Sequence, residues 1–405
     1  MRPHILVLYQ HYRSPDCPAN ARVWSLLRTL RPHAQITLVT SDAWRESRRT
    51  DHYSWFPDGI DAIEVSVPYA NRMTAAQRIR SYTSFALQAL WHGVRKTTPD
   101  LVYGISTPLS TAGAAALVAR WHGVPWIFEL HDLWPAFPIQ MGAVPFRWLQ
   151  RALYRGERAL YRSAAHVVTM SPDMTTYVEG TGQPADRVTT VLPGSNLDCL
   201  HSRAAPSPDQ LRRRYDLPDT PLALYAGTFG RANDIPTLID AARRCADADF
   251  SFLFVGRGFY EPALRRLAAT HSSVHLVPPQ PQHHMGSWYE LADLSLVPFL
   301  DRPVLAANAP AKFFDSLTMG TPVLVTNPGW TRTVVETHGC GWYVPPSDPT
   351  SLARRLRALM TTPGALCEAG ARGRDVARTH FDRAEQFAQI PALVERACAS
   401  NSSPT

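Results

Sequence analysis

The sequence predicts an α/β protein of two Rossmann-like domains, each with a parallel sheet, that face each other across a cleft. Short apolar runs alternate with helical stretches along the whole chain, which is the pattern of a parallel sheet covered by helices. The chain has 405 residues, more than one ordinary hydrophobic core needs, so we expect two domains of about 200 residues each. A proline-interrupted charged segment, residues 201–221, separates two stretches of this alternation and is predicted to be a linker.

The N-terminal domain is predicted to cover residues 1–200. Its seven predicted strands cover residues 4–9, 35–41, 61–67, 101–106, 125–130, 166–170 and 188–192. The C-terminal domain is predicted to cover residues 222–380. Its six predicted strands cover residues 222–227, 250–256, 274–277, 294–299, 322–326 and 341–344. We expect residues 381–405 to be a separate segment that crosses back to the first domain. Because open α/β sheets bind ligands at the carboxyl ends of their strands, the groove between the domains is the expected site.

Composition argues against several classes of protein. Hydrophobic residues make up 45% of the chain and charged residues 19%, which is typical of a globular protein. No apolar run reaches the roughly 20 residues that span a bilayer, and the N-terminus does not resemble a cleavable leader, so a cytoplasmic location is predicted. The six cysteines form no CxxC pair, which argues against a zinc site or a disulfide framework. The net charge of +7 favours anionic partners, but no nucleic-acid-binding signature is present.

Two glycine-rich turns in the second half are candidate phosphate sites. The first strand is followed by QHYRSPDCPAN (residues 10–20), which lacks the GxGxxG of a nicotinamide-binding domain. The glycines occur instead in GTFGRAND (227–234) and VGRGFYEP (255–262), each after a strand and before a helix. Because glycine has no Cβ and helix N-termini attract anions, backbone amides there can approach phosphate oxygens. An ordinary strand-to-helix turn explains either motif alone equally well.

The segment PAKFFDSLTMGTPV (310–323) begins with a predicted helix. Asn308 is the predicted N-cap, Pro310 suits the first turn, and Gly320 suits the left-handed position after the last turn. The helix should therefore cover about residues 311–319 and begin at the carboxyl edge of the sheet, where ligands bind.

Two opposite charges lie in the first turns of this helix. Lys312 and Asp315 are three residues apart and therefore share one helical face. A carboxylate can accept two hydrogen bonds from a ribose diol, and an ammonium group can contact a diphosphate. The alternative is a surface salt bridge that contributes no more than ~0.5 kcal/mol to helix stability.

These segments resemble the sequence blocks of glycosyltransferase family 4, which contains retaining transferases of the GT-B fold. PAKFFDSLTMGTPVLVT matches that family's P-x-K-x-x-E-x-x-x-x-G-x-P-V block. Further blocks are FELHDLWP, VLPGSNLD, YAGTFGRANDIPTLIDAA, FLFVGRG and VHLVPPQPQHHMGSWYELADLSLVPF. Together they cover most of the chain. The resemblance implies that the N-terminal domain binds an acceptor and that the C-terminal domain binds a nucleoside diphosphate sugar.

The resemblance assigns roles to individual residues. Asp315 matches the second acid of the family's E-x7-E motif, which implies a ribose anchor, although the family has Glu there. The first acid falls at Ala307, so the donor-sugar contact of the family is absent, and Asp301 is the nearest acidic substitute.

The family often holds the diphosphate with an Arg and a Lys in its first glycine turn. The matching positions here are Thr228 and Asn233, so the positive charge must come from Arg231, Arg257 or Lys312. This departure resembles the subgroup that acts on lipid-linked or polysaccharide precursors. The complete predicted donor site is Gly227, Thr228, Arg231, Asn233, Gly256, Arg257, Val277, Pro310, Lys312 and Asp315.

The predicted catalytic residues are His131 and Asp132. His131, in the segment ELHD at the end of a predicted strand, matches the family's active-site histidine, which implies a contact with the donor sugar near its diphosphate. A solvated turn histidine is the alternative interpretation.

The reaction implied by the resemblance is transfer with retention, through attack on the same face assisted by the leaving phosphate. Cations and amides at the phosphates stabilise the departing diphosphate. The Asp-x-Asp triplet at residues 247–249 lies at the amino end of a predicted strand, away from the expected cleft. We therefore expect no metal and no cofactor, and the nucleoside diphosphate sugar serves as donor substrate.

A basic segment, PFRWLQRALYRGERALYR (145–162), gives information about where the acceptor is found. Its five arginines recur every three or four residues and share one helical face. Two interpretations remain open. The helix contacts an anionic membrane at the inner face as a peripheral element, or it packs on the protein with a solvated basic side.

The predicted function is that of a hexosyltransferase that moves a sugar onto a glycan or polyprenyl-linked acceptor in polysaccharide or glycoconjugate biosynthesis. One alternative is a nucleotide-sugar epimerase of the same fold, which needs no acceptor. A second alternative, suggested by Ala307, Thr228 and Asn233, is a non-catalytic nucleotide-binding subunit.

Overall fold

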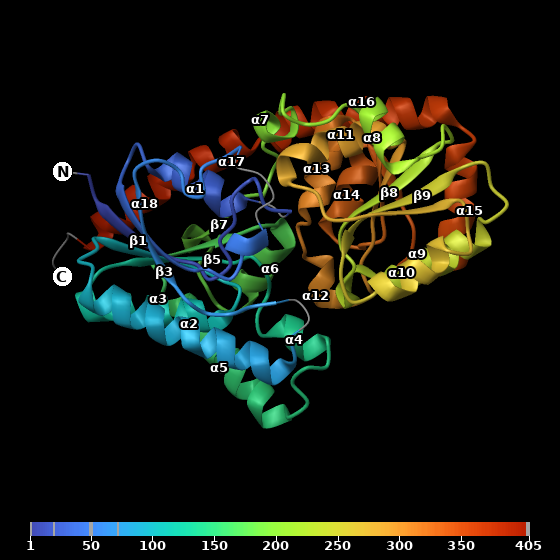
Figure 1. Ribbon diagram of the computed structural model, residues 1–405. Coiled ribbons are helices and arrows are strands. Elements are labelled where there is room, and N and C mark those ends of the chain that lie inside the picture. Colours follow the sequence, from blue (N-terminus) through green and yellow to red (C-terminus); the bar gives the residue numbers. More distant parts are fainter. Residues whose placement is uncertain (1, 19–20, 48–51, 71–72, 402–405) are drawn as a thin grey trace. The chain divides into compact units, whose positions relative to one another are not determined.

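The structure is a computed structural model that describes residues 2–18, 21–47, 52–70 and 73–401 (Figure 1). The described residues form two compact units. Unit 1 consists of the described residues within Met1–Cys17, Ala21–Leu192 and Ala384–Thr405. Unit 2 consists of the described residues within Pro18–Asn20 and Pro193–Arg383. Parts of two predicted segments, residues 19–20 of the first turn and 402–405 of the C-terminal segment, lie outside the described residues.

Unit 1 contains a parallel sheet with the strand order β3-β2-β1-β4-β5-β6-β7. Its strands are β1 (His4–Leu8), β2 (Gln35–Ser41), β3 (Ile60–Val65), β4 (Leu101–Ile105), β5 (Trp126–Glu129), β6 (His166–Thr169) and β7 (Val188–Thr190). The central strands are the most apolar, and β4 is buried along its whole length. This burial is expected of a parallel sheet, because helices cover both of its faces.

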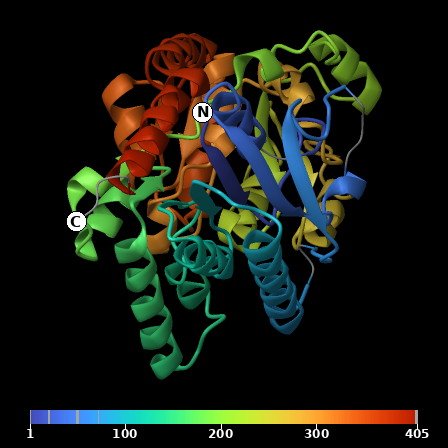
Figure 2. The ribbon, with the colours of Figure 1, turned by 90° about the vertical axis from the view of Figure 1, so that its left-hand side faces the viewer.

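Helices cover the two faces of this sheet. The helices of unit 1 are α1 (Arg22–Leu30), α2 (Ala75–Arg95), α3 (Leu109–His122), α4 (Ala136–Gln140), α5 (Arg147–Ser163), α6 (Pro172–Gly180) and α18 (Ile390–Asn401), with short turns η1 (Arg45–Ser47) and η2 (Ala185–Arg187). Figures 1 and 2 place α1 and α18 on one face and α2, α3 and α5 on the other. Ile390 and Leu393 of α18 are buried in the same core as Leu26 of α1, so the C-terminal helix completes unit 1.

Unit 2 contains a second parallel sheet with the strand order β10-β9-β8-β11-β12-β13. Its strands are β8 (Leu222–Thr228), β9 (Ser251–Arg257), β10 (Val274–Val277), β11 (Leu294–Val297), β12 (Val323–Val325) and β13 (Gly341–Tyr343). Its helices are α7 (Leu197–Leu200), α8 (Pro208–Tyr215), α9 (Ile235–Arg244), α10 (Glu261–Ala268), α11 (Met285–Leu291), α12 (Pro303–Ala306), α13 (Ala311–Met319), α14 (Trp330–His338), α15 (Pro349–Met360) and α16 (Pro363–His380), with turns η3 (Arg231–Asn233) and η4 (Gln282–His284). Helix α17 (Arg383–Ala388) begins in unit 2 and continues in unit 1.

The predicted fold class, two Rossmann-like domains with parallel sheets, is confirmed. Each predicted strand overlaps one observed strand. None of the helices in the described ranges is long and apolar enough to cross a membrane.

The predicted linker differs from the structure. The chain passes between the units after Leu192, and residues 201–221 belong to unit 2. Part of this segment forms α8, which begins with a capping box at Ser207, and Leu211 and Leu217 are buried in the core of unit 2. The sequence is misleading here because Pro208 occupies the first helical turn, where proline is tolerated.

Candidate active site

The two glycine turns of unit 2 meet at the carboxyl ends of β8 and β9. Gly227 and Gly256 are paired across these neighbouring strands, and their φ angles are +137° and +153°. A Cβ atom on Gly256 would lie 1.9 Å from the Gly227 carbonyl oxygen. Only glycine fits at position 256, because a side chain there would overlap the neighbouring backbone.

The rest of this turn is held by its own side chains. The Tyr225 hydroxyl and the Asn233 Nδ2 both donate hydrogen bonds to the Thr228 carbonyl oxygen, at 2.7 Å and 3.0 Å. Asn233, which falls where the family has a basic residue, therefore stabilises the turn. Two arginines lie at this edge. The Arg231 guanidinium is 4.3 Å from the centre of the Phe259 ring, and Arg257 is exposed at the end of β9.

The helix predicted over residues 311–319 is confirmed as α13. The predicted N-cap is wrong, because Pro310 rather than Asn308 caps the helix. The Asn308 carbonyl oxygen instead accepts a hydrogen bond from Trp330 Nε1 at 2.9 Å. Gly320 ends the helix in the left-handed conformation, with φ of +77°, as expected.

Lys312 lies next to the first glycine turn. A Cβ atom on Gly227 would be 3.3 Å from Lys312 Nζ, and this Nζ lies 3.9 Å from the centre of the Tyr225 ring. Burial lowers the pKa of Lys312 to about 7, because less water solvates its charge. An anion bound at this turn would favour the charged form of the amine.

Asp315 is 5% exposed, and its Oδ1 accepts a hydrogen bond from the Ser195 hydroxyl at 2.8 Å. Burial raises the pKa of Asp315 to about 6, although the charge of Arg383 and the Ser195 hydrogen bond oppose the shift. Asp315 and Lys312 thus have different neighbours, which argues against the surface salt bridge as the reason for their spacing.

Ser195 is a candidate site residue that was not predicted from the sequence. It lies in the VLPGSNLD block, 120 residues before its partner Asp315. Arg383, which is 3% exposed, donates hydrogen bonds to the carbonyl oxygens of Pro193 and Gly194 at 2.9 Å and 3.0 Å. The segment that carries Ser195 is therefore held by the last residues of unit 2.

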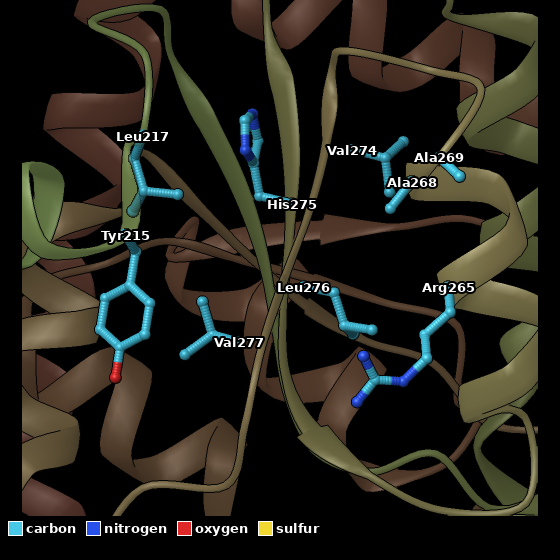
Figure 3. A pocket seen from close by; sticks show the side chains of 9 residues that line it. All are labelled: Tyr215, Leu217, Arg265, Ala268, Ala269, Val274, His275, Leu276 and Val277. Atoms are coloured by element: carbon cyan, nitrogen blue, oxygen red, sulfur yellow. The ribbon is translucent and has the colours of Figure 1, made fainter.

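Val277 pairs across the sheet with Val255, the residue directly before Gly256 on β9. It is buried at the end of β10 and lines a hollow of about 430 Å³ beside this edge strand. In Figure 3, Tyr215 and Leu217 lie on one side of the strand and Arg265 on the other. No other predicted site residue lines this hollow.

In unit 1, His131 is part of a buried hydrogen-bond network around Glu129. This carboxylate, which is fully buried, accepts from Arg22 Nε at 2.8 Å, from the Tyr103 hydroxyl at 2.6 Å and from His131 Nε2 at 2.8 Å. Burial raises the pKa of Glu129, but the Arg22 charge and the hydrogen bonds from His131 and Tyr103 outweigh it and hold the pKa below its usual range. Because an ionised carboxylate can only accept hydrogen bonds, His131 Nε2 carries the proton of this contact, and Glu129 fixes the orientation of the ring.

Asp132 lies beside this network. Its Oδ2 accepts a hydrogen bond from the Thr107 hydroxyl at 2.9 Å, and burial raises its pKa above the usual value. The His131 ring lies 5.5 Å from the Tyr9 ring, and its side chain is only 15% exposed. This exposure does not fit the alternative of a solvated turn histidine.

A cluster of aromatic rings at the same edge of the sheet was also missed. The His11 and Tyr69 ring centres are 4.4 Å apart, and Tyr82 lies 5.9 Å from both Tyr69 and Trp134. Burial and the charge of nearby Arg13 lower the pKa of His11 to about 3, so this ring is neutral. The sequence contains a partial signal for this cluster, because His11 and Tyr69 follow the first and third predicted strands. Their separation along the chain does not show that the two rings are in contact.

Among the described residues, no group of three or more His, Cys, Asp or Glu side chains could hold a metal ion. Asp247, in the Asp-x-Asp triplet, forms an ion pair with Arg357. It lies before β9, at the amino end of that strand, as the sequence predicts.

The chain is similar to known proteins along most of its length. The family model described as a glycosyl transferase 4-like domain matches residues 19–194, and the one described as glycosyl transferases group 1 matches residues 220–362. A curated relative, D-inositol 3-phosphate glycosyltransferase 1 of Catenulispora acidiphila, is 29% identical over 273 residues, which are 62% of each chain. The present chain therefore spans less than two thirds of that relative.

Solved structures share the fold. A sucrose-phosphate synthase from Thermosynechococcus elongatus matches with a TM-score of 0.77 at 18% identity, over 98% of this chain and all of the other. HepE from Anabaena, solved in complex with UDP and glucose, matches with a TM-score of 0.70 at 15% identity, over 97% of this chain and all of the other.

Proposed function

The chain belongs to glycosyltransferase family 4, and from this we propose that it transfers a sugar from a nucleoside diphosphate sugar to a glycan or polyprenyl-linked acceptor, with retention of configuration. The observation that carries the proposal is the position of Lys312 and Asp315. Lys312 lies against the glycine turn at Gly227, while Asp315 is a buried carboxyl group on the same helix. One nucleotide can contact both.

The donor diphosphate is proposed to lie against the glycine turns. The amides at Gly227 and Gly256 can approach its oxygens closely, and Lys312, Arg231 and Arg257 supply positive charge. These groups stabilise the negative charge that develops on the diphosphate as the anomeric bond breaks. Because side chains provide this charge, we expect that EDTA in metal-free buffer leaves the rate of transfer unchanged.

Asp315 is the proposed ribose anchor. With a pKa of about 6, its carboxyl group is mostly ionised at neutral pH and can accept hydrogen bonds from both ribose hydroxyls. In unit 1, His131 and Asp132 are the proposed catalytic residues, and Glu129 is the positioning residue that fixes the orientation of the His131 ring. We propose that the aromatic rings near His11 form part of the acceptor site.

The test begins with nucleotide binding. UDP is the first ligand to try, because the similar protein HepE binds UDP and glucose, and GDP, ADP, CDP and dTDP complete the panel. A nucleotide at ~100 times its Kd should stabilise the native chain by about 2.7 kcal/mol in a thermal-shift measurement. Asp315→Asn should lose this stabilisation.

Asp301→Asn is the matched control, since Asp301 is the exposed acid that the sequence offers as a substitute for the missing first acid. It should keep the shift produced by the nucleotide. If Asp315→Asn responds as the native chain does, the ribose-anchor assignment is wrong.

Turnover distinguishes the alternative functions. Incubation with the matching nucleotide sugar and a glycan acceptor should release nucleoside diphosphate only when the acceptor is present. Change of the donor without acceptor, followed by NMR, would indicate the epimerase. Binding without any turnover would indicate the non-catalytic subunit.

A further inference from the structure

Large hydrophobic side chains are exposed mainly on one face of unit 1. Nine such side chains are exposed among the described residues, and seven of them lie on α2, on α3 or at the start of α5. Helix α2 contributes Ile79, Leu87 and Trp91. The concentration of these residues on neighbouring helices is unusual, because exposed apolar residues are normally scattered singly over a surface.

The other two helices continue the same pattern. Helix α3 contributes Leu117 and Trp121, and the start of α5 contributes Phe146 and Trp148. Trp121 and Trp148 are 70% and 69% exposed. Helix α3 packs against both α2 and α5, and Figures 1 and 2 show all three helices on the same side of the sheet. We call the outward surface of these helices the α2–α3–α5 face.

The charges on this face have one sign. The three helices contain a single acidic residue, Glu157, and it is buried. Exposed basic residues border the apolar side chains. They are Arg80, Arg95, Lys96, Arg120, Arg147, Arg151, Arg155, Arg158 and Arg162. An anionic surface can therefore approach the whole face without meeting an exposed carboxylate on these helices.

The basic and aromatic groups are close together. Trp91 has the Arg95 guanidinium 6.0 Å and the Lys96 amine 5.6 Å from its ring. On α5, Arg151 and Arg155 lie three and seven residues after Trp148 and so share its side of the helix. Tryptophan beside basic residues suits the interface of a bilayer, where the ring enters the headgroup layer and the cation stays at the phosphates.

From this arrangement we propose that the α2–α3–α5 face docks unit 1 on an anionic lipid bilayer. A lipid surface explains the exposed Ile79, Leu87 and Leu117, because aliphatic side chains gain from entering the acyl region but cannot stack on nucleic-acid bases. It also explains the basic border, since each Arg or Lys near an anionic membrane contributes to binding. The inference concerns a surface of unit 1 and does not depend on the proposed transfer reaction.

The test is co-sedimentation of the full chain with vesicles. Vesicles of equal parts phosphatidylcholine and phosphatidylglycerol should bind the chain at low salt, and vesicles of phosphatidylcholine alone should bind it far less. Replacing Arg151, Arg155 and Arg162 together by Gln should lower the partition coefficient on the order of 100-fold, because each arginine contributes about 1 kcal/mol. Trp121→Ala combined with Trp148→Ala should lower it by at least about tenfold.

The matched control removes the same charge elsewhere. Arg213, Arg266 and Arg354 are exposed on helices of unit 2, and their joint replacement by Gln should leave vesicle binding within about twofold of native. All three combined variants alter exposed side chains, so unchanged far-UV circular dichroism and melting temperature are expected of each.

Three results would overturn the proposal. The first is no binding to the anionic vesicles at low salt. The second is equal loss of binding in the unit 2 control, which would indicate attraction by net charge alone. The third is binding to single-stranded RNA but not to vesicles, which would assign the face to nucleic acid instead.

Discussion

Lys312 is a half-buried amine with a pKa of about 7, so bound diphosphate should change its protonation. In the free chain at about pH 8 the amine is mostly neutral, and a nearby diphosphate raises its pKa. We expect UDP binding at about pH 8 to take up close to one proton, measured by calorimetry in buffers of different ionisation enthalpy.

Lys312→Arg provides the control for this prediction. Arginine remains protonated at any pH used, so this variant should bind UDP with little proton uptake. Equal uptake in the native chain and in the variant would show that another group titrates.

The hydrogen-bond partners of Asp315 and Glu129 could not be predicted from spacing along the sequence. Lys312 and Asp315 were found because three residues bring two side chains onto one helical face. Ser195 is 120 residues from Asp315, and Arg22 is 107 residues from Glu129. The folding of the whole domain, and no local pattern, brings each of these pairs together.

At the scale of elements, the β8 and β9 turns depend on one backbone contact. Gly256→Ala should destabilise unit 2 by about 1–3 kcal/mol, because its Cβ would overlap the Gly227 carbonyl oxygen and because φ is +153°. It should also abolish nucleotide binding, since the turn must shift. Urea unfolding and the thermal-shift panel measure the two effects.

Gly230→Ala is the control within the same turn. A Cβ there would be 3.4 Å from its nearest neighbour, Asn233 Nδ2, and its φ is not in the left-handed region. This variant should keep nucleotide binding. Equal loss in both variants would contradict the assigned role of Gly256.

Helix α5 carries a buried acid, Glu157, whose charged form destabilises the folded domain. Glu157 accepts hydrogen bonds from Tyr161 and Tyr177 at 2.9 Å and 3.0 Å, and burial raises its pKa to about 7. The pKa of Glu157 is higher in the folded than in the unfolded chain. The contribution of this group to the free energy of unfolding is therefore fully present below about pH 4.5 and is lost as the pH rises through about 7.

Glu157→Gln should therefore raise the melting temperature at about pH 8 and change it little at about pH 5. Differential scanning calorimetry at the two pH values checks this. Exposed Glu336, which pairs with Arg332 on the surface of α14, gives the control Glu336→Gln. An equal effect of Glu157→Gln at both pH values would contradict the raised pKa.

At the scale of the whole molecule, the C-terminal helix belongs to the core of unit 1. Ile390 is fully buried in that core, so Ile390→Ala should lower the stability of unit 1 by about 2–5 kcal/mol. Hydrogen exchange should become faster in β1 and β4 and remain unchanged in β8 and β9. Faster exchange in β8 and β9 alone would be inconsistent with the assignment of α18 to unit 1.

The sequence by itself determined the class of fold, the family and the helix that carries Lys312 and Asp315. Each of these predictions depends on a pattern that lies within a short, continuous stretch of the chain. The patterns are apolar runs of strand length, a helix with proline at its start and glycine at its end, and contiguous sequence blocks. Local backbone preferences and side-chain periodicity produce such patterns, and they can be read without knowing what packs on them.

Only the tertiary structure decided which distant groups meet and which surfaces stay uncovered. It placed Ser195 on Asp315, closed the buried network around Glu129 and joined α18 to the first domain. It also left Trp121 and Trp148 exposed on one face. Burial is a property of the packed chain, because the same apolar periodicity serves a covered helix and an uncovered one, and only the neighbouring elements distinguish them.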